Sequence, residues 1–127
     1  MIVLDTNTLI DYYEERLAAS AVEQLINIFS NRQYCISIIT RMEMRIGIDK
    51  QSAPDTVERF LQNAACVDVW PGIEFEAVRI RTAYRLKLPD AIIAATAYYL
   101  GATLATNDAT GFTRVPGLDV WEPERRG

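Results

Sequence analysis

The sequence contains no histidine in its 127 residues. Histidine is the usual general base near neutral pH, so its absence excludes Ser-His-Asp and Cys-His catalysis, and it also excludes His-ligated zinc. Any hydrolytic chemistry in this protein must therefore rely on carboxylates. Carboxylates that work without histidine commonly do so together with a metal ion.

Cysteines and long hydrophobic runs are also scarce. Cys35 and Cys66 lie in apolar surroundings rather than in a metal-type or redox-type spacing, so we expect two reduced core residues of a cytosolic protein. The apolar stretch 91–105 includes threonines and a glycine and is shorter than the ~20 residues of a membrane span. Asp5 interrupts the N-terminal apolar run, so we expect no signal peptide and a soluble, cytoplasmic protein.

Positive charge is limited too. The chain has 13 Lys and Arg residues against 17 Asp and Glu residues, for a net charge of −4 and a pI of about 4.8. Taken alone, this balance argues against a surface that binds phosphate groups.

Half of the residues are apolar, and the length of the chain suits one domain with its own hydrophobic core.

Short apolar runs alternate with segments of helical periodicity. Strands are expected at 2–4, 33–37, 66–70, 103–106 and 118–122. Helices are expected from a cap at Asn7 or Thr6 to about 15, at 17–30, from 39 or 40, from a Ser52 cap to 65, at 74–86 and at 90–100. This alternation predicts an α/β fold with a parallel sheet in one domain, residues 1–127, with a polar tail from about residue 123.

Four carboxylates follow this pattern. Asp5 ends the first strand, Asp108 follows the fourth strand, and Glu43 lies near the first turn of the helix after the second strand. Such positions share the carboxyl edge of a parallel sheet. Asp90 opens a helix that precedes a strand, so the pattern does not assign it to the same edge.

Each acid also has an ordinary interpretation. Asp90 would favour the dipole of its helix, Glu43 would be an exposed surface acid, and Asp108 would be a turn residue. Taken together, clustered carboxylates without histidine repel one another and require a cation, and hard oxygen ligands favour Mg²⁺ or Mn²⁺.

Four segments carry a resemblance to a known family. They are Leu4-Asp5-Thr6-Asn7, Ile39-Thr40-Arg41-Met42-Glu43, Leu88-Pro89-Asp90-Ala91-Ile92-Ile93-Ala94-Ala95-Thr96-Ala97 and Leu104-Ala105-Thr106-Asn107-Asp108. Their order and spacing resemble PIN-domain proteins, and most closely the VapC-type toxins of toxin–antitoxin pairs. The likeness covers essentially the whole chain, although the segment that contains Glu43 is weak by itself.

The resemblance implies a five-stranded parallel sheet flanked by helices, and an Mg²⁺- or Mn²⁺-dependent endoribonuclease that cleaves RNA by metal-activated water. The implied acidic cluster is Asp5, Glu43, Asp90 and Asp108, with Asp5 and Asp90 in contact with metal, and with Asn7 and Thr106 in supporting positions. The loop around Asp108 is short, so Asn107 is an alternative for its role. The implied partners are RNA, a VapB-like antitoxin and a second copy of the chain.

A path for the RNA backbone is predicted beside these acids. Arg41 and Arg45 lie one helical turn apart and can share a face, and Arg32 and Lys50 are nearby candidates. Ordinary solvated surface charge is the alternative for all of them.

Two other functions are compatible with parts of the sequence. The stretch after Asp5 superficially resembles the first motif of haloacid-dehalogenase-like phosphohydrolases, but Asn7 stands where a second Asp would be needed. The chain could also be a PIN-fold module that binds RNA or a partner with little catalysis, which the presence of all four acids disfavours.

Overall fold

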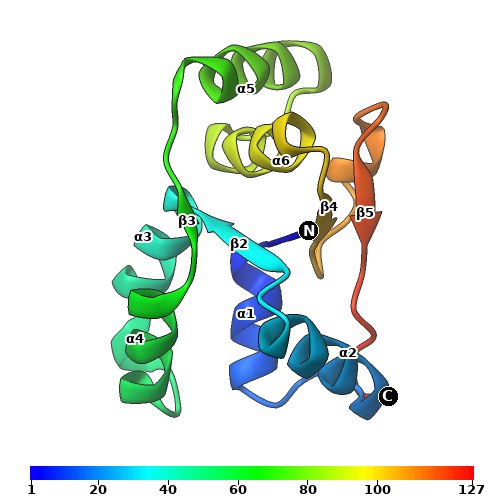
Figure 1. Ribbon diagram of the computed structural model, residues 1–127. Coiled ribbons are helices and arrows are strands. Elements are labelled where there is room, and N and C mark those ends of the chain that lie inside the picture. Colours follow the sequence, from blue (N-terminus) through cyan, green and yellow to red (C-terminus); the bar gives the residue numbers. More distant parts are fainter.

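Five short parallel strands form the centre of the molecule (Figure 1). The structure is a computed structural model that describes residues 1–127. The strands are β1 (Ile2–Leu4), β2 (Tyr34–Ser37), β3 (Cys66–Val67), β4 (Thr103–Ala105) and β5 (Asp119–Trp121). Their order is β3-β2-β1-β4-β5, and every pairing is parallel. The predicted sheet is therefore confirmed, and β1 is its central strand.

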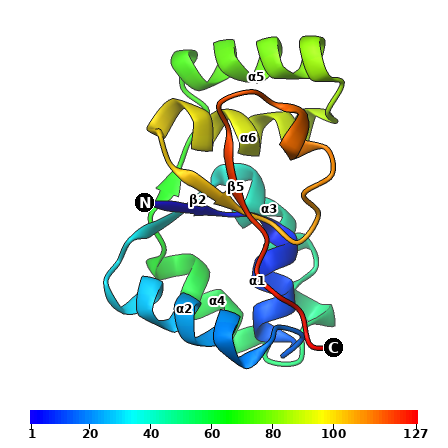
Figure 2. The same ribbon diagram turned by 90° about the vertical axis from the view of Figure 1, so that its right-hand side faces the viewer.

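Helices cover both faces of the sheet. They are α1 (Thr6–Tyr13), α2 (Ala19–Ser30), α3 (Ile38–Ile46), α4 (Pro54–Asn63), α5 (Pro71–Tyr84) and α6 (Leu88–Leu100), with 3-10 turns η1 (Ile48–Lys50) and η2 (Phe112–Arg114). Helix α6 covers one face, and α5 lies outside it as a further layer; α1, α2 and α4 lie on the opposite side (Figures 1 and 2). Helix α3 packs against both α1 and α6. None of the helices combines the length and the hydrophobicity that a membrane crossing would need.

Side chains of each strand alternate between two cores. Val3 and Leu104 face the core under α6, whereas Leu4 and Ala105 face the core on the side of α1 and α2. All four are fully buried, as expected for a parallel sheet covered on both faces. The sheet is thus packed on both faces, against α6 on one side and against α1 and α2 on the other.

Several predicted boundaries were wrong. Helix α1 begins after Asp5, whose carboxylate accepts a hydrogen bond from the Thr6 amide, so the cap is Asp5 rather than Asn7 or Thr6. Ser52 does not cap α4, because its hydroxyl and amide bond the carboxylate of Glu14. The polar segment after residue 122 is docked on the domain, where Arg125 pairs with Leu17 in an antiparallel bridge.

Helix α5 begins three residues earlier than predicted, with Pro71 in its first turn. Its buried residues are Ile73, Ala77 and Ile80, whereas the apolar side chains of Phe75 and Val78 are 69 % and 58 % exposed. The sequence of α5 has apolar residues on more than one face, so periodicity alone did not decide which face is buried.

The packing of α5 leads to a first prediction. Ile80→Ala should lower the free energy of unfolding by roughly 2–5 kcal/mol, because it leaves a cavity between α5 and α6. Val78→Ala, on the same helix, should change it by no more than about 0.5 kcal/mol. Urea denaturation of the two variants measures the difference; equal losses would contradict the observed orientation of α5.

Candidate functional site: four acids at the carboxyl edge of the sheet

Asp5 lies where β1 ends and α1 begins, and its side chain is 4 % exposed. One carboxylate oxygen, Oδ1, accepts a hydrogen bond from the Thr6 amide at 2.8 Å, and Oδ2 accepts one from the Thr106 hydroxyl at 2.7 Å. Strand β1 therefore places Asp5 at the sheet edge. The Thr6 amide at the start of α1 and the Thr106 hydroxyl directly after β4 orient its carboxylate.

The surroundings of Asp5 disfavour its negative charge. The pKa of Asp5 is raised from 3.8 to about 6. Burial is the main cause, the hydrogen bonds from Thr106 and Thr6 oppose the rise, and the nearby charges of Asp90 and Glu43 add to it. This carboxylate therefore gains from either a proton or a cation.

Glu43 reaches the same place from α3. It lies in the second turn of that helix rather than the first as predicted, because α3 begins at Ile38 behind a Ser37 cap. The Thr6 hydroxyl donates to Glu43 Oε1 at 2.6 Å and lies 3.2 Å from the Thr40 hydroxyl. Thr6 therefore connects the acid of α3 directly to the start of α1.

Asp90 lies in the first turn of α6 and is half-buried. Helices α5 and α6 together connect β3 to β4, and α6 runs back across the sheet to the start of β4, so its first turn lies at the carboxyl edge beside Glu43 and Asp108. Burial raises the pKa of Asp90, as do the charges of Glu43 and Asp108, and Lys87 opposes them. The charges of all four predicted acids are thus felt within one site.

The loop after β4 carries Asp108. The Asp108 amide donates to the Thr106 hydroxyl at 3.1 Å, and the Asn107 amide donates to Asn7 Oδ1 at 3.0 Å. Both polar atoms of the Asn107 side chain are engaged, with Thr8 and Pro123, whereas the Asp108 carboxylate makes no side-chain hydrogen bond.

Sequence reasoning assigned no linking role to four side chains that connect the elements of the site: Thr6, Thr8, Thr40 and Asn107. They join residues from 34 to 100 positions apart, so no local pattern marks them. The only available signal was the density of hydroxyl and amide residues directly after β1 and β4.

The donor atoms of the site decide whether it fits a divalent cation. No group of three or more Asp, Glu or Cys side chains is arranged here to hold one ion. The donor set nevertheless consists of oxygen atoms, and each Asp5 oxygen, with one bond to a protein hydrogen, retains a second lone pair. The chemistry of these residues therefore fits a hard divalent ion.

The two predicted RNA-binding arginines differ in their surroundings. Arg45 forms a two-pronged ion pair with Glu58, with Nε 3.0 Å from Oε1 and Nη2 3.2 Å from Oε2. Arg41 forms no ion pair and no side-chain hydrogen bond. Arg41 is therefore the freer cation of α3.

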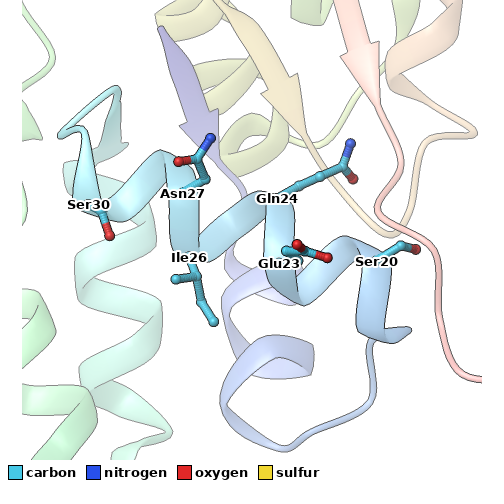
Figure 3. A pocket seen from close by; sticks show the side chains of 6 residues that line it. All are labelled: Ser20, Glu23, Gln24, Ile26, Asn27 and Ser30. Carbon is cyan, nitrogen blue, oxygen red and sulfur yellow. The ribbon is translucent and has the colours of Figure 1, made fainter.

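A surface hollow on α2 lies apart from this chemistry (Figure 3). All its lining side chains belong to that one helix, and Glu23 is the only acid among them. A single carboxylate along one helix offers no partner for acid–base or metal chemistry, so the hollow is no rival to the acidic cluster.

Comparison with known proteins agrees with this geometry. The PIN domain profile matches residues 2–118. The chain belongs to the PIN-domain family. PIN domains are metal-dependent nucleases, and this PIN domain is 30 % identical to the tRNA(fMet)-specific endonuclease VapC of Salmonella typhimurium, over 93 % of this chain and 94 % of that protein. It is therefore a nuclease of the VapC toxin type.

Solved structures give the same result. A toxin–antitoxin complex from Klebsiella pneumoniae matches this PIN domain with a TM-score of 0.80 and 31 % identity, covering 99 % of this chain and 100 % of that one. DNA-bound VapBC from Salmonella typhimurium matches with a TM-score of 0.77 and 28 % identity, covering 94 % and 96 %. The predicted family and fold are confirmed.

The buried charge of Asp5 leads to a second prediction. Its folded pKa of about 6 exceeds its ordinary value of 3.8, so the stability associated with its protonation is present below about pH 4 and is lost as the pH rises through 6. Without divalent ions, Asp5→Asn should therefore be more stable than the parent at about pH 7.5, by an amount on the order of 3 kcal/mol at most.

Thermal unfolding of parent and Asp5→Asn in EDTA, from about pH 4 to pH 8, measures this difference. The advantage of the variant should shrink as the pH falls below 6 and vanish near pH 4. A difference independent of pH would show that Asp5 is not held in a state that disfavours its charge.

Proposed function

We propose that Asp5, Glu43, Asp90 and Asp108 form the catalytic centre of this VapC-type nuclease, with Mg²⁺ or Mn²⁺ as cofactor and RNA as substrate. The observation that carries the proposal is the convergence of four carboxylates from β1, α3, α6 and the loop after β4 on one sheet edge. Such a cluster has no structural reason to exist unless a cation offsets its charge.

Each residue has a distinct part in the proposed reaction. A divalent ion supplies positive charge for the phosphate and lowers the pKa of the attacking water. Asp5 and Asp90, the two acids whose burial most disfavours an uncompensated charge, hold the ion. Glu43 or Asp108 accepts the proton that the attacking water loses, and the Thr6 hydroxyl orients Glu43.

Thr106 and Asn7 support this centre without touching the reacting atoms. The Thr106 hydroxyl donates to Asp5 while it accepts from the Asp108 amide, so it fixes two of the acids relative to each other. Asn7 holds the backbone of the Asp108 loop through the Asn107 amide.

The proposed partners follow from the relatives. The Salmonella relative is named for tRNA(fMet), so this tRNA is the first substrate to test. The Klebsiella and Salmonella neighbours are complexes with an antitoxin, and we propose a VapB-like antitoxin for this chain as well. Because its proposed substrate is RNA, the proposed site of action is the cytoplasm.

Residues 1–127 act as one nuclease unit, and the chain forms a homodimer.

The central test is cleavage of RNA. The purified chain should cleave tRNA(fMet) in Mg²⁺ or Mn²⁺ and lose the activity in EDTA. Asp5→Asn and Asp90→Asn should each lower kcat by more than about 100-fold, since loss of an indirect partner of a metal already costs 10–100-fold. Gel analysis of the cleaved RNA measures these rates.

Asp55→Asn is the matched control. Asp55 follows Pro54 in the first turn of α4, as Asp90 follows Pro89 in α6, but it is exposed and outside the cluster. This variant should cleave at the rate of the parent. If Asp5→Asn and Asp90→Asn bind RNA but cleave as fast as the parent, the site is wrong; if the parent binds RNA without cleaving it, the chain is a binding module.

The environment of α3 leads to a further prediction. Arg41→Ala should raise the KM for RNA by about tenfold with little change in kcat, because it removes one charge-assisted bond to phosphate. Arg45→Ala should have a smaller effect, because Arg45 is already paired with Glu58. Steady-state kinetics at fixed salt distinguish the two; a larger effect of Arg45→Ala would contradict the prediction that the unpaired Arg41, rather than the Glu58-paired Arg45, binds the phosphate.

A further inference from the structure

The C-terminal segment Glu122–Arg126 follows a defined path after β5. It passes beside α1 (Figure 2) and bridges to the segment that joins α1 to α2. The Ala18 amide donates to the Glu124 carbonyl at 2.8 Å, and the Arg126 amide donates to the Arg16 carbonyl at 3.0 Å. The PIN domain match ends at residue 118, so this segment lies outside the part of the chain that the family profile describes.

One end of this segment is anchored on a buried charge. Asp11 of α1 is 2 % exposed, and its Oδ2 lies 2.7 Å from Arg125 Nη2 and 2.8 Å from Arg125 Nε. Arg16 reaches the other oxygen at a longer distance of 3.4 Å. A buried carboxylate that loses its partner is strongly destabilising, so Asp11 holds Arg125 in place.

The other end of the segment contacts the acid-bearing loop. The Pro123 carbonyl accepts a hydrogen bond from Asn107 Nδ2 at 2.7 Å, and Asn107 Oδ1 accepts one from the Thr8 hydroxyl at 2.9 Å. Asn107 is thus clamped between the C-terminal segment and α1. Its two sequence neighbours are Thr106, which donates to Asp5, and Asp108, which is itself one of the acids.

We propose that Glu122–Arg126 is a strut that positions the acids, with Asp11 and Arg125 as its anchor and Asn107 as the positioning residue at its other end. The strut fixes the backbone at Asn107, and thereby the separation of Asp108 from Asp5. This inference rests on the proposed acidic site but assigns a role to residues outside it. Neither Asn107 nor Arg125 touches the reacting atoms.

Two variants test the strut from its two ends. Asn107→Ala removes both side-chain bonds, and Arg125→Ala removes the closer of the two cations at Asp11 and with it the anchor. In hydrogen exchange without metal or RNA, the Asn107 and Asp108 amides should exchange about tenfold faster or more in both variants, because their local opening becomes easier.

Activity provides a second measurement. Asn107→Ala should lower kcat by roughly 10–100-fold, as for other partners that orient metal ligands, and it should raise the Mn²⁺ concentration for half-maximal rate. The KM for RNA should not change. A residue that only stabilises the fold would lower the Tm and leave the dependence on Mn²⁺ unaltered below the melting range.

Each variant has a matched control. Arg16→Ala also removes a cation from Asp11 but leaves Arg125 and the strut in place. Asn63→Ala removes a similar 2.7 Å hydrogen bond from an Asn side chain to a backbone carbonyl. That bond lies within α4, which carries none of the four acids. Both controls should match the parent in amide exchange at residues 107 and 108 and in their dependence on Mn²⁺.

The proposed role of the strut is contradicted if the amides of residues 107 and 108 exchange at the parent's rate in both Asn107→Ala and Arg125→Ala. It is also contradicted if Arg16→Ala accelerates their exchange as much as Arg125→Ala does. Exchange is measured without substrate, so this result is decisive whether or not Asp5→Asn abolishes cleavage. Cleavage that survives Asp5→Asn would contradict the proposed catalytic site, whereas the strut would still be supported or overturned by amide exchange alone.

Discussion

The Asp5 carboxylate is held at the end of a central, doubly covered strand, almost out of contact with water and close to the charges of two other acids. Water cannot solvate it, so its charge is stabilised only by the Thr6 amide, the Thr106 hydroxyl and whatever cation enters the site. The raised pKa reflects this constraint. A buried charge of this kind lowers the stability of the metal-free protein. Such a loss of stability is expected at a functional site, where residues are selected for their chemistry.

Hydroxyl and amide side chains convert the cluster of acids into a defined arrangement. Thr6 connects α1 to Glu43 of α3, Thr106 connects Asp5 to the loop of Asp108, and Asn107 connects that loop to the C-terminal segment. Each of these connections joins elements that are distant in sequence but adjacent at the sheet edge. The acids are therefore oriented by a network that closes around β1, and removing one member is expected to disturb the geometry more than the fold.

Much of this arrangement was predictable from the sequence because strand ends, helix starts and turn residues are local signals. The order of strands and helices, the burial of Cys35 and the family resemblance of the short motifs around Asp5 and Asp90 were correct, whereas Cys66, also predicted as a core residue, is only partly buried. The position of Asp90 does not follow from the rule for a single crossover helix, because two helices, α5 and α6, connect β3 to β4. The buried face of α5 and the docking of residues 122–126 could not be predicted either, because they depend on side-chain packing and on bonds between distant positions such as Asp11 and Arg125.

The central claim is that a divalent ion binds at this cluster of acids through Asp5 and Asp90. The most direct test is titration of the metal-free protein with Mn²⁺, in which electron paramagnetic resonance measures the concentration of free Mn²⁺. We expect saturable Mn²⁺ binding by the parent and by Asp55→Asn, and its loss in both Asp5→Asn and Asp90→Asn. Equal Mn²⁺ binding by all four proteins would contradict the claim.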